Sequence, residues 1–259
     1  GCSFLFGQFP VDLIPDEITD SHTFSVESDT ELLLTITAST NTNWSIMNGE
    51  SSTLVVLVDG EVDDYNQDVV LYAGQVMHNY NCSLGHMGSG EHSIEFIFDY
   101  EKSSIAAEWV HIESIELIDI STLSIDEDVF RYSPILYGRD LFAWNESTHT
   151  DIPLIMWHDV SMEDTNKIIT YSIIFSNEDS RVGVGLADLM YSYGRTTDIE
   201  WVYEVVLGVN GDIVSEIFQG PSHTTTNFQG NKVGQHPILK NATLNCNFID
   251  TGSSNYKFF

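Results

Sequence analysis

The sequence is poor in basic residues. Only 9 lysines and arginines stand against 39 aspartates and glutamates, the formal net charge is −30, and residues 1–101 contain no lysine or arginine. Binding to phosphates or to anionic lipids needs clustered cations, so nucleic acid and anionic membrane surfaces are not expected partners. Charge of one sign repels itself unless counter-ions gather nearby, so bound calcium or a salty medium is an expectation.

Long hydrophobic runs are also missing. The longest, such as "TLVVLVDG" (53–60) and "IPLIMW" (152–157), are far shorter than the roughly 20 apolar residues of a membrane-spanning helix, so no membrane insertion is expected. The first residues lack the basic stretch of a signal peptide, so an exported protein would begin here in its mature form. With 259 residues and 42% hydrophobic content, the chain can form two ordinary domains or one large all-β domain.

Cysteine is scarce, and the 3 residues make an odd number. No two of them are close enough for a CxxC metal or redox motif. In an oxidising compartment, a Cys82–Cys246 disulfide would join the two halves and leave Cys2 for an intermolecular bond. The alternative is three buried, reduced thiols.

Four Asn-x-Ser/Thr sequons are candidate glycosylation sites. Together with the acidity and the few lysines, they predict an extracellular or cell-surface glycoprotein. The acceptor residues are Asn43, Asn81, Asn145 and Asn241.

Short segments rich in valine, isoleucine, leucine, phenylalanine and threonine follow one another along the chain, separated by turn residues. This spacing is typical of antiparallel β-sandwiches. The predicted fold class is all-β, with two jelly-roll-like β-sandwich domains and an apolar N-terminal arm. The expected divisions are the arm at 1–16, the first sandwich at 17–121, a linker at 122–133 and a second β-rich domain at 134–259.

Local patterns in the second half predict particular elements. "VLGVNGDIVSEIF" (206–218) is typical of a hairpin with Asn210-Gly211 in a type I′ turn. Residues 186–193 are the segment in which we expect a helical turn. Strict alternation in "DIEWVYEVVL" (198–207) would put one set of residues in the core and a polar set on the other face. The core set is Ile199, Trp201, Tyr203, Val205 and Leu207, and the polar set is Asp198, Glu200 and Glu204.

The first segment, "CSFLFGQFPVDLIP" (2–15), is too apolar to stay in water. It covers the sandwich of its own chain, or it inserts as a strand into a neighbouring subunit. Head-to-tail repetition of such an insertion would build a filament of identical chains. The residues expected to make this contact are Phe4, Leu5, Phe6, Phe9, Val11, Leu13 and Ile14.

Residues 54–120 resemble the jelly-roll carbohydrate-binding modules that accompany carbohydrate-active enzymes. "LVVLVDGEV", "LGHMGSGEHSIEFIFDY" and "VHIESIEL" carry this likeness. It implies a lectin-like front domain that binds glycans through exposed aromatic side chains. The second half resembles an uncharacterised family of secreted proteins through "GRTTDIEWVY", "FQGPSH" and "GQHPIL", and that resemblance implies no activity.

Arg195, Asp198 and Glu200, with His158 and His223, are the candidate catalytic residues. Paired carboxylates suit acid–base attack on a glycosidic bond, and arginines would hold the carboxylates of uronic acids. A histidine would instead serve as the base of a polysaccharide lyase. The alternative is an Arg195–Asp198 ion pair that merely closes a turn. GxSxG, HExxH and P-loop motifs are absent from the sequence, so it lends no support to those enzyme classes.

The acidic run "DGEVDDYNQD" (59–68) is rich in the oxygen ligands that calcium prefers, although its spacing is not that of an EF-hand. A solvated acidic loop is the alternative. The candidate calcium ligands are Asp59, Glu61, Asp63, Asp64 and Asp68.

Each of the 5 tryptophans is a candidate platform for stacking against a sugar. Trp157 and Trp201 lie in strand-like segments and are expected in the core. Trp144 is expected to be the exposed one, and the remaining two are Trp44 and Trp109.

These observations predict a non-catalytic extracellular glycoprotein, a structural or adhesive subunit that self-assembles and binds glycans through its front domain. The alternative is a carbohydrate-active enzyme, a lyase or a hydrolase, that uses the Arg195–Asp198–Glu200 region.

Overall fold

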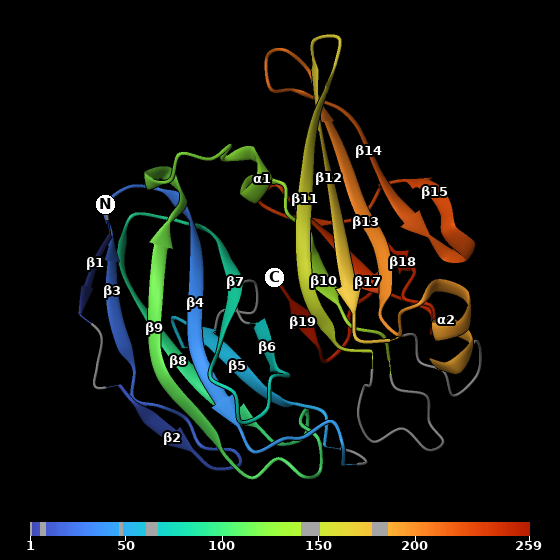
Figure 1. Cartoon of the computed structure of the whole chain (residues 1–259). Helices are drawn as coiled ribbons and strands as arrows, with labels where there is room; N and C mark the ends of the chain where they lie inside the picture. Colours follow the sequence, from blue (N-terminus) through green and yellow to red (C-terminus); the bar gives the residue numbers. More distant parts are fainter. Residues whose placement is uncertain (1, 6–8, 47–48, 61–66, 141–150, 178–185) are drawn as a thin grey trace. The chain divides into compact units, whose positions relative to one another are not determined.

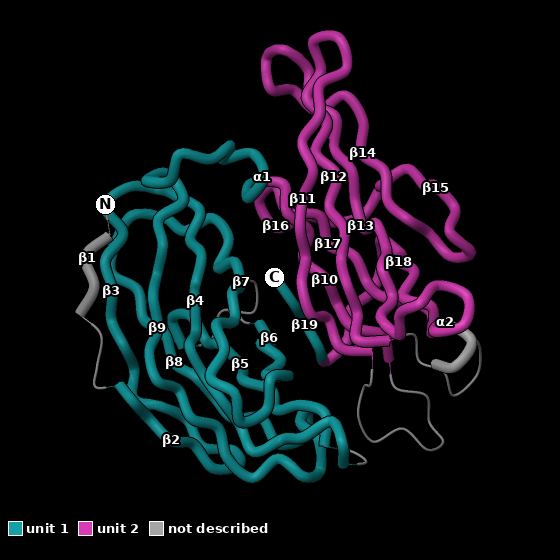
Figure 2. The backbone as a smooth tube through the Cα atoms, in the orientation of Figure 1, with its two compact units in different colours: residues 1–131, 256–259 teal, residues 132–255 magenta. Residues whose placement is uncertain are grey.

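The computed structural model describes residues 2–5, 9–46, 49–60, 67–140, 151–177 and 186–259 (Figure 1). Strands dominate these residues and the helices are short, so the predicted all-β class is confirmed. Within the described ranges, none of the helices has the length and hydrophobicity that crossing a bilayer requires. The chain divides into unit 1, residues 1–131 with 256–259, and unit 2, residues 132–255 (Figure 2).

Unit 1 contains two antiparallel sheets. The strand order is β1-β3-β8-β5-β6 in one sheet and β2-β9-β4-β7 in the other. The strands are β1 (Cys2–Leu5), β2 (Val11–Leu13), β3 (His22–Val26), β4 (Thr30–Thr40), β5 (Ser52–Val58), β6 (Gln67–Leu71), β7 (His78–Met87), β8 (Gly90–Asp99) and β9 (Val110–Asp119).

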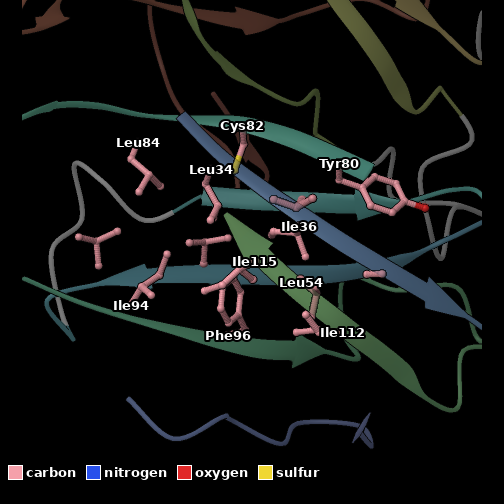
Figure 3. Close-up of a cluster of buried hydrophobic side chains, with 14 of the residues drawn as sticks. Leu34, Ile36, Leu54, Tyr80, Cys82, Leu84, Ile94, Phe96, Ile112 and Ile115 are labelled. Carbon is pink, nitrogen blue, oxygen red and sulfur yellow. The ribbon is translucent and has the colours of Figure 1, made fainter. Parts of the chain in front are cut away.

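The core of unit 1 lies between these sheets. Along β4, every second residue from Leu32 to Ala38 is fully buried, which is the two-residue period of a strand with one face inward. Side chains of β5, β7, β8 and β9 meet those of β4 (Figure 3). Each fully buried leucine, isoleucine or phenylalanine contributes about 1.5–3 kcal/mol relative to exposure, so this layer holds the sandwich together.

The N-terminal arm lies on its own sandwich. β1 pairs with β3 at the edge of one sheet, and β2 pairs with β9 at the edge of the other. Leu13 is 2% exposed, Phe9 and Val11 pack against the core, and Ile14 is 58% exposed. Of the two alternatives for the arm, the structure shows the intramolecular one. The side chains of Phe4 and Leu5, and Phe6 as a whole, lie outside the described residues.

The strand β9 contains a bulge. Thr37 of β4 pairs with Ser114, whereas the next residue, Ala38, pairs with Ile112, so Glu113 is an extra residue. The extra residue lets side chains on both sides of it reach the core.

The last four residues return to unit 1, which differs from the expected second domain at 134–259. The short strand β19 (Lys257–Phe258) lies beside β6. The backbone N–H of Lys257 donates to Asp68 Oδ2 at 2.8 Å, and Lys102 Nζ donates to Asp68 Oδ1 at 2.7 Å. Ser83 N–H donates to the carbonyl oxygen of Phe259 at 2.9 Å. The bonds from Lys257 and Lys102 satisfy the carboxylate of Asp68, which is 4% exposed.

A short helical segment leads from unit 1 to unit 2. It consists of the 3-10 turn η1 (Ile120–Thr122) and the helix α1 (Asp128–Arg131). The side chain of Asp119 caps η1 by accepting from Ser121 N–H at 3.0 Å.

Unit 2 is built on a five-stranded antiparallel sheet in the order β11-β12-β13-β14-β15. A smaller group of strands contains β17 with β16, β18 and the parallel β10 as neighbours. The elements are β10 (Ile135–Tyr137), β11 (Pro153–Glu163), β12 (Asn166–Phe175), α2 (Leu186–Tyr193), β13 (Asp198–Leu207), β14 (Ile213–Gly220), η3 (Pro221–His223), β15 (Thr224–Asn227), β16 (Lys232–Val233), β17 (His236–Asn241) and β18 (Phe248–Ile249).

The helical turn predicted at 186–193 is confirmed as α2, and the predicted hairpin is confirmed as β13 and β14. Its turn type was wrong. Gly211 has a φ of +80°, but Asn210 is not in the left-handed region, and Gly211 N–H donates to the carbonyl oxygen of Gly208. This geometry is a type I turn that ends in a left-handed glycine. An Asn-Gly pair is compatible with this turn as well as with a type I′ turn.

We predict that the pairing of the N-terminal arm with β9 becomes less stable as pH rises. His111 of β9 lies 2.6 Å from Asp12 of the arm and 3.1 Å from Glu113, and these carboxylates raise the pKa of His111 against the effect of burial. A histidine with a raised folded-state pKa contributes stability below its unfolded pKa of about 6.5 and loses it as pH rises through the folded value. Hydrogen-exchange protection factors of residues 11–13 should therefore fall above neutral pH.

The variant His111→Gln is the control, because it keeps a hydrogen-bonding side chain without the charge. Its protection factors at residues 11–13 should not change with pH over the same range. An identical pH dependence in the parent protein and the variant would contradict the role of His111.

Candidate functional site

A bulge in β13 decides where the acids of this strand lie. Tyr203 pairs with Tyr171 of β12, but the next pair is Trp201 with Ser172, so Val202 is an extra residue. One extra residue reverses the faces of all side chains beyond it.

The predicted inward and outward faces of β13 are therefore wrong for residues 198–201, which precede the bulge. Asp198 and Glu200 are 4% and 7% exposed, and they lie on the buried side that Tyr203 occupies after the bulge. Ile199 is 41% exposed, and Trp201 is only half-buried rather than in the core. The two carboxylates that alternation assigned to solvent lie inside unit 2.

Glu200 lies in a hydrogen-bonded group with residues from β14 and η3. The side-chain amide of Gln219 donates to Glu200 Oε2. The same amide nitrogen lies 2.6 Å from His223 Nδ1, which is 3.5 Å from Glu200 Oε2. The side chain of His223 is 58% exposed, whereas Gln219 is 2% exposed. A solvent-accessible imidazole thus covers a buried carboxylate.

Asp198 lies beside the thiol of Cys246. Burial raises the pKa of Asp198, against hydrogen bonds from Ile199 N–H and the Cys246 thiol and the positive charge of Arg195. Burial also raises the pKa of Cys246 well above its usual value, with the charges of Asp151 and Asp198 adding to the effect. Asp198 can therefore hold a proton at a higher pH than an exposed aspartate, and the thiol stays protonated and unreactive.

Two buried oxygen atoms of this group, Asp198 Oδ2 and Gln219 Oε1, accept no hydrogen bond from the residues that the structure describes. Backbone strain gathers here too: Ser222, His223 and Cys246 have φ values of +60°, +58° and +51°. Left-handed conformations of such residues cost on the order of 1 kcal/mol each and are concentrated at functional sites. We call Asp198, Glu200, Gln219, His223 and Cys246 the buried acid cluster.

Two of the predicted catalytic residues do not join the cluster. His158 is exposed on β11, the outer strand of the sheet, two strands away from β13. Arg195 donates to the carbonyl oxygen of Thr197, and its guanidinium lies 5.5 Å from the ring of Tyr193.

A second arginine of this half, Arg139, is 2% exposed and forms a two-bond ion pair with Asp151, with N–O distances of 2.8 and 3.1 Å. Arg139 is thus not placed to hold the carboxylate of a uronic acid, whereas the positive charge of Arg195 already acts on Asp198.

The expected Cys82–Cys246 disulfide is absent: both cysteines are free and buried. Cys82 faces the core of unit 1 from β7, and Cys246 belongs to unit 2. Each thiol is enclosed by the packing of its own unit, which favours the alternative of reduced cysteines for these two. The side chain of Cys2 lies outside the described residues.

The predicted glycosylation sites fall into different environments. Asn43 and Asn81 are exposed, whereas Asn145 lies outside the described residues. Asn241 is 4% exposed, and its Oδ1 accepts from Thr243 N–H at 3.2 Å. A side chain so buried has no room for a glycan, so the prediction for Asn241 is wrong.

The predicted calcium ligands that the structure describes have other partners. Asp59 accepts from Ser93 N–H and lies 2.8 Å from His92 Nδ1, and Asp68 accepts from Lys102. Across the described part of the chain, no three histidine, cysteine, aspartate or glutamate side chains are grouped to hold a metal ion. The remaining candidates, Glu61, Asp63 and Asp64, lie outside the described residues.

Unit 1 offers a different kind of surface where three of its connections meet. They are residues 41–46 with 49–51, 72–77 and 100–109, which follow β4, β6 and β8 at the lower end of unit 1 in Figure 1. Asn41 Nδ2 donates to the carbonyl oxygen of Ala106 at 2.8 Å, which ties the first connection to the third. We call these three connections the loop end.

Gly74 fixes the remaining connection. Thr40 N–H donates to the carbonyl oxygen of Gly74 at 2.9 Å. Gly74 has a φ of +61°, and a Cβ atom there would lie 2.5 Å from the carbonyl oxygen of Thr42. Only glycine suits both the conformation and the close approach, so Gly74 lets the 72–77 connection lie directly against Thr40 and Thr42.

Trp44 is the aromatic side chain that stands out at the loop end. Its indole is 46% exposed, and its Nε1–H donates to the carbonyl oxygen of Tyr72 at 2.8 Å. Tyr72 in turn packs against Tyr80 edge-to-face at 5.4 Å, and its hydroxyl lies 3.2 Å from His78 Nε2. The indole is thus both open to solvent and held in one orientation. Trp144, the tryptophan predicted to be exposed, lies outside the described residues.

Further apolar side chains are exposed around this platform. Scattered apolar residues are normal on a surface, but a group of them at one end of a domain is typical of a contact site. They are Ile46, Val76, Met77, Tyr100 and Ile105, which are 38–67% exposed.

Comparison with known proteins identifies no family for this chain. No family model and no curated protein matches it, so the resemblance of the second half to secreted proteins stays a prediction. Solved structures are similar only at low identity. One is a CBM35 module described in complex with a glucuronic acid-containing disaccharide, which is 12% identical in sequence. The match covers 38% of this chain and 65% of that module, and its TM-score is 0.28.

Two further solved structures are similar to part of this chain at comparably low identity. The CBM36-1 domain of a xylanase from the hindgut metagenome of Trinervitermes trinervoides is 12% identical, with 43% of this chain covering 86% of that domain at a TM-score of 0.30. The sugar-binding EclA C-terminal domain is 9% identical, with 45% covering 83% at a TM-score of 0.30. The ligands of these proteins are not carried over to this chain, whose function has to be argued from its own residues.

Proposed function

We propose that this chain is a non-catalytic carbohydrate-binding protein, and that the loop end of unit 1 contacts the glycan. The observation that carries the proposal is the exposed, hydrogen-bonded indole of Trp44. The faces of a pyranose ring present C–H groups, which pack against an aromatic face, while the hydroxyl groups at the ring edge seek polar partners. An indole already held in place loses little side-chain freedom when a sugar binds.

Self-assembly through the arm is not part of this proposal. The backbones of β1 and β2 pair with strands of their own unit. Exchange of the arm between chains would have to break these pairs and expose the core residues that Leu13 covers. The partner that we propose for the loop end is a glycan and not a second copy of the chain.

The binding prediction is tested on Trp44. Trp44→Ala removes the stacking surface, and affinity for a panel of soluble polysaccharides should fall at least about tenfold, equivalent to about 1.4 kcal/mol. Affinity gel electrophoresis with the intact protein measures the change. Tyr191→Ala is the matched control, because it removes a 92% exposed aromatic ring from unit 2 and should leave binding unchanged. Equal losses in both variants, or no binding by the parent protein, would defeat the proposal.

The same proposal places the protein outside the cell as a glycoprotein. Support comes from the formal charge of −30 and from the exposed sequons at Asn43 and Asn81. A glycan on Asn43 would stand next to the platform residue Trp44, so Asn81 is the acceptor compatible with binding. In protein secreted from a eukaryotic host, peptide mapping should find N-glycans at Asn81 and none at the buried Asn241. Modification of Asn241, or an unmodified chain, would contradict the assignment.

A second candidate function is carbohydrate-active catalysis by the buried acid cluster. The observation favouring it is the combination of Asp198, whose pKa is raised by burial, with strained backbone at Ser222, His223 and Cys246. An aspartic acid that keeps its proton beside a second carboxylate, Glu200, is an arrangement found in general acid–base pairs.

Polysaccharide cleavage tests this second candidate. If the cluster is catalytic, the intact protein releases reducing ends or unsaturated sugars from a polysaccharide panel, and Asp198→Asn or Glu200→Gln reduces the rate at least about a hundredfold. His158→Gln, outside the cluster, should keep the parent rate. Both acid variants preserve shape, and circular dichroism checks that they fold. No release by the parent protein, or equal rates in all variants, would reject catalysis by these residues.

A further inference from the structure

We propose that the loop end selects uncharged glycans and repels those that carry uronic acids. This inference rests on the proposed function, since it concerns which sugars the Trp44 surface accepts. It follows from the charged residues that the loop end carries.

The basic side chains of unit 1 are committed to other contacts. Lys102 lies in the loop end, but its Nζ is 2.7 Å from Asp68 and 3.7 Å from Asp99, and it is only 20% exposed. Arg131 forms ion pairs with Asp128 and Glu127, and these three residues lie far along the chain from Trp44. Lys257 is 9% exposed. Among the described residues of unit 1, no lysine or arginine presents an open charge beside Trp44.

Carboxylates, by contrast, are present on the loop end itself. Glu101 and Glu108 are exposed, and Glu50 is half-buried with its Oε2 3.3 Å from the hydroxyl of Ser104. The backbone of Glu108 is fixed, because its N–H donates to Asn41 Oδ1 at 2.8 Å. His78, which follows the 72–77 connection, has its Nε2 3.2 Å from the hydroxyl of Tyr72.

This distribution acts differently on the two classes of sugar. A uronate carboxylate is usually held by arginine or lysine, and here it would meet charges of its own sign on the loop end. Two like charges 4 Å apart in water repel by about 1 kcal/mol, and several carboxylates act together within the Debye length of about 10 Å. Hydroxyl groups of an uncharged sugar can instead donate to the same carboxylates, and such bonds are stronger than those between neutral groups.

Matched polymers test the selection with the intact protein. Cellulose, xylan and mannan are each prepared as hydroxyethyl and carboxymethyl derivatives, which carry substituents of similar size with and without charge. Affinity electrophoresis at low salt should show binding to a hydroxyethyl derivative and at least about fivefold weaker binding to its carboxymethyl counterpart. The difference should shrink in 1 M salt, where the Debye length is about 3 Å.

The outcomes separate the two proposals. If no uncharged or charged polymer binds, or if Trp44→Ala binds like the parent protein, carbohydrate binding at the loop end fails. If binding depends on Trp44 but carboxymethyl derivatives or polygalacturonate bind as tightly as uncharged polymers, only the selection fails.

A charge reversal tests the mechanism of the selection. Glu108→Lys should strengthen binding to carboxymethyl derivatives at least about threefold and leave binding to hydroxyethyl derivatives within twofold. Glu116→Lys changes the net charge equally, but this exposed residue lies on β9 roughly 25 Å further along the chain at about 3.3 Å per residue, so it should have no effect. Equal gains from both variants would show a general effect of net charge and overturn the assignment to the loop end.

Discussion

Shortage of positive charge is the constraint on which much of this structure depends. With 39 acidic and 9 basic side chains, most carboxylates that enter the fold must find neutral donors. Asp119 accepts from the hydroxyls of Thr30 and Ser121, both at 2.7 Å, and these bonds outweigh burial and lower its pKa. The bases Arg139 and Lys102 are each paired with a buried aspartate. Few cations are left to meet an anionic ligand.

The same constraint gives the two units different chemical characters. In unit 1, the buried carboxylates Asp68 and Asp119 accept from a lysine and from hydroxyl groups, while Glu101 and Glu108 remain exposed. In unit 2, Asp198 and Glu200 are drawn inside, where a thiol and a side-chain amide are their neutral partners. Because a thiol is a weak donor, Asp198 stays poorly compensated, and protonation relieves the cost of burying its charge.

The sequence predicts this fold wherever the signal is local. Alternation and turn residues locate most strands, the β13–β14 hairpin and the helix α2. The strand β7 is not predicted in this way, because Asn79, Asn81 and Gly85 interrupt its apolar pattern. At the buried acid cluster, the extra residue Val202 cannot be seen in a one-dimensional pattern, yet it reverses the faces of Asp198 and Glu200. Gln219 reaches the cluster because β14 pairs with β13 in the predicted hairpin, whereas Cys246 is brought beside Asp198 from a part of the chain distant in sequence, for which the sequence carries no local signal.

The return of residues 256–259 to β6 makes unit 1 discontinuous in sequence. On the ribosome, residues 1–131 are made before unit 2 and can begin to fold before it. Asp68 receives the backbone N–H of Lys257, its second donor besides Lys102, only after all of unit 2 has been translated. Completion of unit 1 therefore depends on translation of the whole of unit 2.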